Sequence, residues 1–426
     1  MKKKLFAGVL VLVTLLSCNR SNKIGTDNPD FKMVSNQVIL DWNEMAYAAM
    51  GSETYQHSLL ASRINAMVHL AMHDALNAVN PVFKTYAFSK TDPSANPIVA
   101  AATAAHEVLV TQFPDKKAML DSMLAVSTAN ISDSSSVIKG RAIGQQAGKA
   151  IVALRATDGA LQDPISPIDP SAIPGVYQPV PPTEFLFAPF WKNMKTFGLI
   201  DAKQFRVAAQ PALESAEYAK GFEEVKIFGR KDSDARSADQ TDYAKFWYEF
   251  SEAGWNRIAR EAISVKKPDL WHTARIFALV NMALADAYTA GWDSKFHYNF
   301  WRPYTAIRKA DSDNNQATAP DVSWEPLMNT PPVQDYPSTH SALGSAAATV
   351  LTTVIGDNVP FTFRSVTADA SKPTRDFSSF KQAAIENADS RVMAGLHFRF
   401  SCDTGLNLGE KVGKWMVDQH LTPVAK

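Results

Sequence analysis

Apolar residues recur three and four positions apart over several long stretches of the chain, the spacing that places them on one face of an α-helix. These stretches are rich in Ala, Leu, Met and Val, and alternation with a period of two is scarce. We therefore expect an all-α fold. The predicted helices cover residues 58–79, 97–112, 136–157, 273–290, 341–354 and 405–420.

Residues 163–189 interrupt this pattern with closely spaced prolines. Proline removes a backbone donor and breaks a helix interior, and it is excluded from central strands. We expect this stretch to run over the surface as a long connection between two helical regions.

An internal repeat relates those two regions. Three short matches occur in the same order in both halves of the chain, which predicts a duplicated helical bundle. We expect one helical domain, residues 35–426, with an N-terminal scaffold bundle at about 35–160 and a catalytic bundle at about 270–420. The matches pair residues 63–75 with 275–287, 104–109 with 346–351, and 144–149 with 409–414.

The first 18 residues have the pattern of an export signal. A basic start precedes an apolar run, residues 5–16, which is too short to span a bilayer but fits a signal-peptide core. The run Leu15-Leu16-Ser17-Cys18 resembles a bacterial lipoprotein signal, which implies a lipidated Cys18 and an exported protein of the bacterial cell envelope. A simple signal peptide with a chance cysteine is the alternative. Residues 19–34 are polar and predict a flexible tether.

Overall composition narrows the partners. Lys plus Arg and Asp plus Glu are each 43, with no basic tract, so nucleic acid is not an expected partner. Membrane contact is expected only through the lipid on Cys18. The other cysteine, Cys402, is interpreted as structural, and no Cys, His or carboxylate pattern indicates zinc or calcium.

A first chemically distinctive patch holds Lys295 and Arg302 in an aromatic setting. Their spacing would place both on one face of a helix, although Pro303 disfavours helix at Arg302 and predicts a helix end there. Aromatic neighbours favour partial burial, and buried cations need an anionic partner. The alternative is a helix end with solvated cations.

Two further patches follow. Pro337-Ser338-Thr339-His340 precedes a helix of small residues, which predicts an N-cap whose free N–H groups could bind an anion. Taken alone, it could equally be a simple cap with an incidental histidine. Further on, Arg391 and His397 flank Gly395, and a turn at this glycine would bring both side chains to one pocket.

Together the patches read Lys-x6-Arg-Pro, Pro-Ser-x-His and Ser-Arg-x5-His. This order resembles the three-part signature of the superfamily that unites vanadium-dependent haloperoxidases with type 2 phosphatidic acid phosphatases. The resemblance covers about residues 283–414, and the segment 298–303 resembles bacterial members on the haloperoxidase side. It implies a vanadium chloroperoxidase or acid phosphatase-like fold of two pseudo-repeated helical bundles.

The resemblance also implies a site for vanadate, or for phosphate in a phosphatase. His397 would be the vanadium ligand or the phosphatase nucleophile, and His340 would be the general acid and base. Trp292 and Val333 would line the halide side. The residues implied to bind the oxyanion are Lys295, Arg302, Ser338, Thr339, Arg391 and His397.

Two positions depart from the family pattern. Thr339 stands where the family usually has glycine, and its side chain is expected to add bulk beside the oxyanion. Ser401 stands where an aspartate usually orients the last histidine, with Asp403 as a candidate substitute. A hydroxyl raises imidazole basicity less than a carboxylate does, so vanadate affinity is the property in question.

Three functions are compatible with this sequence. The first is a haloperoxidase that uses hydrogen peroxide, a halide and vanadate; the second is a phosphomonoester hydrolase; the third is a non-enzymatic envelope lipoprotein that binds oxyanions. Membrane-embedded lipid phosphatases are excluded because no apolar run of spanning length follows the signal. Asp286 repeats Asp74 and is interpreted as fold-keeping, and His69, His73 and His297 as structural or supporting residues.

Overall fold

The computed structural model describes residues 34–51, 57–169 and 171–425. The predicted signal peptide, Cys18 and nearly all of the predicted tether lie outside the described residues.

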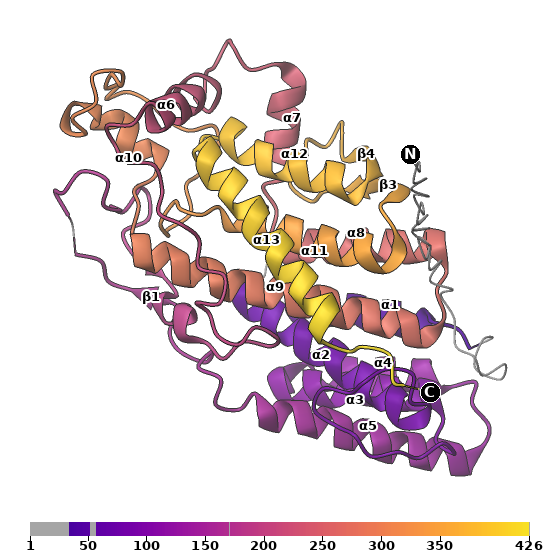
Figure 1. Ribbon diagram of the computed structural model, residues 1–426. Coiled ribbons are helices and arrows are strands. Elements are labelled where there is room, and N and C mark those ends of the chain that lie inside the picture. The colour runs from indigo at the N-terminus through magenta and orange to yellow at the C-terminus, as the bar shows by residue number, and fades with distance from the viewer. Residues whose placement is uncertain (1–33, 52–56, 170, 426) are drawn as a thin grey trace, which may run out of the picture.

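The chain is mostly helical, and all six predicted helices are present (Figure 1). Two have the predicted bounds, and the other four differ from them by a few residues, up to eight at one end. The longest helix, α9, packs along α2, α11 and α13, so it lies at the centre of the molecule. The six are α2 (Ser58–Val79), α3 (Pro97–Gln112), α5 (Ser134–Leu154), α9 (Leu270–Tyr298), α11 (Thr339–Ile355) and α13 (Arg399–Gln419).

The apolar periodicity missed several elements. Among them is an antiparallel hairpin of β3 (Asn358–Arg364) and β4 (Thr374–Ser379), in which Phe361 pairs with Phe377. Strand β3 does alternate buried and exposed residues, so its signal is present but short. In its described residues, the proline-rich connection contains the two-residue strands β1 (Ile165–Ser166) and β2 (Leu186–Phe187), and a short 3-10 helix begins at Pro189. The additional helices are α1 (Gln37–Ala49), α4 (Lys117–Thr128), α6 (Ala216–Phe228), α7 (Ala238–Phe246), α8 (Ser251–Lys266), α10 (Pro303–Arg308) and α12 (Phe380–Met393).

Rows of glycine support the duplication. A side chain on Gly144 of α5 would place its Cβ 2.5 Å from the Ala100 carbonyl oxygen of α3. The matching Gly409 of α13 packs in the same way on the Ala342 carbonyl of α11. These glycines let each helix pair approach backbone to backbone, and they recur every four residues on both helices.

Two buried aspartates repeat the same role in each half. Asp74 on α2 accepts backbone N–H bonds from residues 86–88. Asp286 on α9 accepts N–H bonds from residues 197–199. Each carboxylate therefore fixes a loop onto its own helix, as expected for a fold-keeping residue.

The two halves meet at a buried polar cluster. The side-chain amide of Asn43 on α1 donates to Asn256 on α8 (2.8 Å) and lies 2.8 Å from His69 Nε2. The Asn256 amide in turn donates to Asn281 on α9 (2.9 Å). Both α1 and α8 carry Trp-Asn-x-x-Ala at this point, a repeat signal that apolar spacing alone did not reveal. His69 is thus part of the bundle interface.

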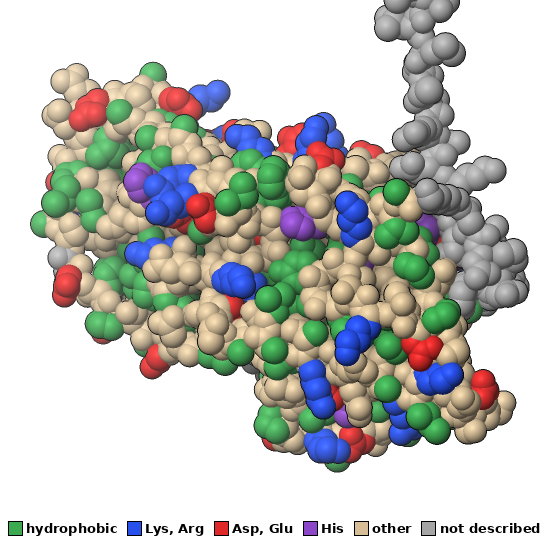
Figure 2. Space-filling model, turned by 60° about the horizontal axis from the view of Figure 1, so that its bottom comes forward, with side chains coloured by type: hydrophobic (Ala, Val, Ile, Leu, Met, Phe, Trp, Pro, Cys, Tyr) green, Lys and Arg blue, Asp and Glu red, His purple; other side chains and the backbone are tan. Residues whose placement is uncertain are grey.

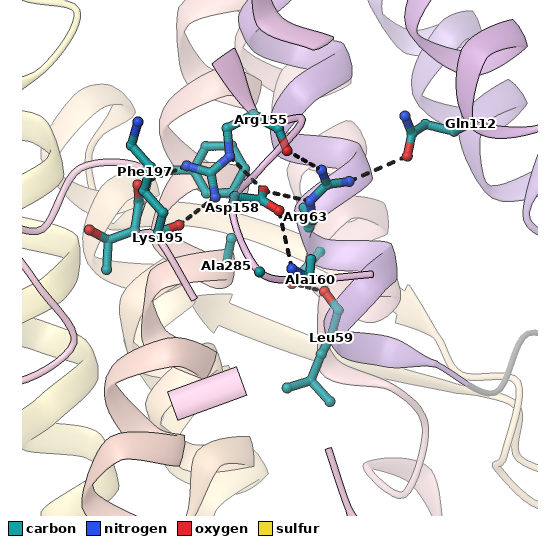
Figure 3. A network of polar contacts seen from close by, with 12 residues as sticks. Leu59, Arg63, Gln112, Arg155, Asp158, Ala160, Lys195, Phe197 and Ala285 are labelled. Carbon is teal, nitrogen blue, oxygen red and sulfur yellow. Dashed lines mark hydrogen bonds and ion pairs between the residues drawn. The ribbon is translucent and has the colours of Figure 1, made fainter. Parts of the chain in front are cut away.

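A second buried cluster ties the N-terminal bundle to the connection (Figure 3). Arg63 and Arg155 both donate through Nε to Asp158, at 2.7 and 2.8 Å. Arg63 also donates to Gln112 and to a backbone carbonyl, while Arg155 donates to the carbonyls of residues 195 and 196. We call these three residues, Arg63, Arg155 and Asp158, the scaffold cluster.

The surface is mixed in character. On the face shown in Figure 2, basic, acidic and apolar side chains are interspersed. None of the helices in the described part of the chain is long and apolar enough to cross a membrane.

Candidate oxyanion site

The first two cations lie on different elements. Lys295 belongs to the last turn of α9, which ends at Tyr298, and Asn299 follows it in the left-handed region (φ 50°). Arg302 is the N-cap of α10, with Pro303 at its first position. The two cations therefore do not share one helical face, because the helix ends and the chain turns between them. The helix end predicted from Pro303 comes four residues before Arg302.

Both cations are buried and held by backbone carbonyls. Lys295 Nζ donates to the carbonyl oxygens of Gln334 (2.6 Å) and Asp335 (2.9 Å). Arg302 donates through Nε to Val333 O (2.7 Å) and through Nη1 to Leu396 O (2.8 Å). The segment that leads to Ser338 and the turn that leads to His397 are thereby drawn around the same pair of charges.

Ser338 is the N-cap of α11, as its sequence context predicts. Its Oγ accepts a bond from Ser341 Oγ (2.9 Å), and its backbone N–H donates to Ser401 O (2.9 Å). A Cβ on Gly405 would lie 2.3 Å from Ser338 O, so α13 packs directly against this cap. The cap is therefore fixed from both sides.

The side chain of Thr339 packs against α9. A Cβ placed on Gly291 of α9 would lie 2.4 Å from Thr339 Cγ2, so the threonine methyl fills the space above that glycine. The first copy has Val79 at the position that matches Gly291. The missing side chain on α9 thus accommodates the methyl group of Thr339 on α11. Added bulk beside the oxyanion stays a prediction.

The predicted turn between Arg391 and His397 is present. Arg391 lies in the last turn of α12, and Gly395 follows with φ 78°. A Cβ on Gly395 would lie 2.4 Å from the Gly229 carbonyl, so both conformation and space require glycine here. The backbone N–H groups of residues 396 and 397 return to Arg391 O, which closes the turn.

Arg391 has the most exceptional environment in the site. Its side chain is 2% exposed, yet its Nε and Nη1 have no hydrogen-bond partner in the described part of the chain. The guanidinium carbon lies 5.8 Å from the centre of the Tyr248 ring. Burial lowers the pKa of Arg391 to about 10. A buried cation with free donors is costly unless an anion binds it.

His397 contacts a carboxylate that the sequence did not reveal. Its Nδ1 lies 2.9 Å from Oδ1 of the fully buried Asp335, whose other oxygen accepts a hydrogen bond from Ser401. The proposed substitute, Asp403, is wrong: it is exposed on α13. Asp335 directly precedes the Tyr-Pro-Ser-Thr-His patch, and this nearness was the available signal.

His340 and the residues of the expected halide side are also placed. His340 Nε2 lies 2.9 Å from the Glu249 carbonyl oxygen, so in the neutral ring Nε2 carries the proton and Nδ1 has the lone pair. Burial, followed by the Arg391 charge, lowers the pKa of His340. Trp292 and Val333 are both buried, and the Trp292 ring contacts Tyr288 edge to face.

The charges at this site fit a multiply charged oxyanion. Lys295, Arg302 and Arg391 are buried together with the carboxylate of Asp335, and burial raises the pKa of Asp335 to about 6. Burial, followed by the charge of Arg302, lowers the pKa of His397, so its imidazole is neutral. Fixed guanidinium groups and a neutral imidazole suit the equatorial oxygens and the central atom of a vanadate or phosphate group.

Known proteins share this fold. Residues 275–425 match the family described as the VCPO second helical-bundle domain. The vanadium chloroperoxidase of Curvularia inaequalis is 28% identical over 304 residues, which are 55% of this chain and 48% of that protein. The chain thus spans about half the length of this curated relative.

Solved structures extend the likeness to nearly the whole chain. A bacterial vanadium-dependent iodoperoxidase has a TM-score of 0.78 and 28% identity, covering 92% of this chain and 98% of that one. A bacterial vanadium-dependent chloroperoxidase has TM-scores of 0.69 in its apo form and 0.67 in its holo form. Each of these two matches is 17% identical; the apo form covers 84% of this chain and 93% of that one, the holo form 92% and 95%. The chloroperoxidase-like fold expected from the sequence is confirmed.

Proposed function

Because the chain belongs to the vanadium haloperoxidase family, we propose that it is a vanadate-dependent enzyme that oxidises a halide with hydrogen peroxide. The observation that carries the proposal is the buried Arg391, whose Nε and Nη1 lack partners in the described part of the chain. An oxyanion bound between Arg391, Arg302 and Lys295 would supply the missing acceptors and offset the buried charge.

The residues that would hold vanadate have distinct tasks. Lys295, Arg302 and Arg391 would neutralise its oxygens, while the Ser338 hydroxyl and the Thr339 N–H would donate to them. His397 would bind vanadium through Nε2. Bound vanadate supplies a Lewis acid that activates hydrogen peroxide toward the halide.

Proton movement is assigned to His340. Its Nε2–H is engaged by the Glu249 carbonyl, so Nδ1 is the atom that takes up a proton and returns it. Its lowered pKa keeps the ring neutral at neutral pH, which suits a proton acceptor. Trp292 and Val333 would form the apolar side that the halide enters. Iodide is the first halide to test, because the bacterial iodoperoxidase is 28% identical to this chain and the two chloroperoxidase structures are 17% identical.

The experiment compares two reactions on one preparation. The purified chain is dialysed against orthovanadate and assayed for iodide and bromide oxidation with peroxide, beside hydrolysis of p-nitrophenyl phosphate. We expect vanadate-dependent halide oxidation that phosphate inhibits and that His397→Ala abolishes. Phosphatase turnover that vanadate inhibits, without halide oxidation, would favour a phosphomonoesterase. Neither activity, together with no vanadate binding, would leave a non-enzymatic lipoprotein.

The envelope location is a separate proposal from the sequence. Cys18 would carry the lipid anchor, and the catalytic domain would face the periplasm or the outer-membrane surface. Metabolic labelling with a clickable palmitate analogue tests this. Labelling that Cys18→Ser removes supports the proposal, and equal labelling of both chains, or none, would overturn it.

A further inference from the structure

We propose that Asp335 is the positioning residue of His397 and that Ser401 holds Asp335 in place. The carboxylate that orients His397 would thus come from the segment before α11, whereas the sequence pattern suggested one on α13. The inference rests on the proposed function insofar as His397 binds vanadium. Its geometric part, the orientation and tautomer of the ring, stands without it.

Contacts on both sides of His397 define its tautomer. Nε2 lies 2.9 Å from Nη1 of Arg302, and a guanidinium nitrogen can only donate. Nδ1 lies 2.9 Å from Oδ1 of Asp335, and a carboxylate oxygen accepts. The two contacts agree: Nδ1 carries the proton, and Nε2 presents its lone pair on the side of the cations. No hydrogen bond within the described chain reaches Oδ1 of Asp335, so the 2.9 Å approach of His397 Nδ1 is an ion-pair contact and not an aligned hydrogen bond.

Asp335 is itself rigidly placed. Its backbone N–H donates to Phe300 O (3.0 Å), and its carbonyl accepts from Lys295 Nζ (2.9 Å). Its carboxylate Oδ2 accepts from the Ser401 hydroxyl. The cation on α9 thus fixes the backbone of the residue that orients His397, so ring and cation keep one relative geometry.

Ser401 contacts both Asp335 and the Ser338 cap. Its hydroxyl binds Asp335, and its carbonyl accepts from the backbone N–H of Ser338 at 2.9 Å. Serine here leaves room for a carboxylate that arrives from another segment, and it supplies the donor that this carboxylate needs. One of the two positions, 335 and 401, thus supplies the carboxylate and the other the hydroxyl that binds it. A variant that exchanges the two residues tests this arrangement.

The test uses four variants of the full chain. Asp335→Ala removes the carboxylate, Asp335→Ser combined with Ser401→Asp reverses the pair, and Asp403→Ala is the matched control on an exposed carboxylate of α13. Asp335→Asn keeps the shape without the charge, in case the alanine variant does not fold. Nitrogen-15 NMR of labelled histidine rings, with His397→Gln for assignment, reports the tautomer without any bound anion. Calorimetry measures the dissociation constants of vanadate and phosphate.

We expect the wild type and Asp403→Ala to show a single Nδ1–H tautomer for His397. Asp335→Ala should give mixed tautomers and vanadate binding about 10- to 100-fold weaker, the usual effect of losing a residue that supports a ligand. Phosphate, held by the cations without a nitrogen bond, should weaken much less. The reversed pair should recover most of the vanadate affinity and the single tautomer.

Three results would overturn the inference. The first is an unchanged tautomer in Asp335→Ala, and the second is an equal loss of phosphate and vanadate affinity in Asp335→Ala or Asp335→Asn. The third is a reversed pair no better than the single variant. Failure of halide oxidation in the wild type would defeat the proposed function only, because the tautomer and the ratio of anion affinities are read without turnover.

Discussion

Each half of the molecule has a cluster of buried arginines, and the two clusters differ in whether the arginine donors have hydrogen-bond partners. In the scaffold cluster, both arginines share one aspartate, and each of their donor nitrogens has a protein acceptor. In the oxyanion site, Arg391 leaves Nε and Nη1 without a partner in the described part of the chain. Both clusters are buried, so burial alone does not distinguish a structural charge from a functional one.

This difference indicates which of the two clusters is a ligand-binding site. A buried charge with every donor satisfied stabilises the fold and needs nothing further. A buried charge with free donors raises the free energy of the folded protein unless an anion supplies acceptors. Such a charge therefore indicates an anion-binding role. Substitution in the first cluster should therefore cost stability, and substitution in the second should cost function.

The largest effect is expected in the scaffold cluster. Arg63→Met removes donors from Asp158, from Gln112 and from the Arg155 carbonyl. We expect the free energy of unfolding, measured by urea titration, to fall by about 3–5 kcal/mol. The folded variant should keep its vanadate affinity. Loss of vanadate binding without loss of stability would reverse the roles of the two clusters.

Arg391→Met should show the opposite pattern. Halide oxidation should fall about 10²- to 10³-fold, because a donor to the oxyanion is lost. Stability without anion should stay the same or rise, because an unpartnered buried charge is removed. Steady-state kinetics and urea titration on the same samples check both parts. A large loss of stability would mean that Arg391 is structural.

His69, a buried histidine of the N-terminal half, should affect stability and not halide oxidation. Burial, followed by the Arg260 charge, lowers the pKa of His69 to about 3, so the ring is neutral when folded. Its contribution to stability is then present above the unfolded pKa near 6.5 and is lost progressively toward pH 3. His69→Asn introduces the residue type found at the matching position 281 of the second copy. In this variant the fall in the free energy of unfolding between pH 6 and pH 4 should be about 2–3 kcal/mol smaller. Urea titrations at both pH values measure it, and halide oxidation at neutral pH should persist. An identical pH slope in both chains would contradict the assignment.

Anion binding should sharpen the contrast further. Phosphate at ten times its dissociation constant should stabilise the wild type by about 1.4 kcal/mol. Arg63→Met should be stabilised by the same amount when phosphate is at ten times the dissociation constant measured for that variant. At the wild-type phosphate concentration it should nearly vanish in Arg391→Met. Urea titration with and without phosphate checks this, with chloride at equal ionic strength as the control. Equal stabilisation of all three chains would place the anion elsewhere.

The sequence predicted what is local and missed what is distant. Ser338 as a cap and the turn at Gly395 follow from neighbouring residues, and both are present. Asp335 could not be assigned to His397, because their contact joins segments 62 positions apart whose meeting depends on the packing of α11 and α13. The direction of Thr339 likewise depends on Gly291, a residue on another helix. The proposed boundaries of the two bundles stay predictions.

The pair of Gly291 and Thr339 gives the smallest and most specific expected effect. Because the Thr339 methyl packs over Gly291 and leaves its backbone N–H unchanged, Thr339→Gly should alter vanadate affinity less than about threefold, or about 0.6 kcal/mol. Gly291→Ala should weaken binding more, because its Cβ would collide with Thr339 Cγ2 and shift the Ser338 cap. The double variant should bind like Thr339→Gly alone. Calorimetric titration of the three chains measures this coupling, and simple addition of the two single effects would show that the threonine methyl does not occupy the space above α9.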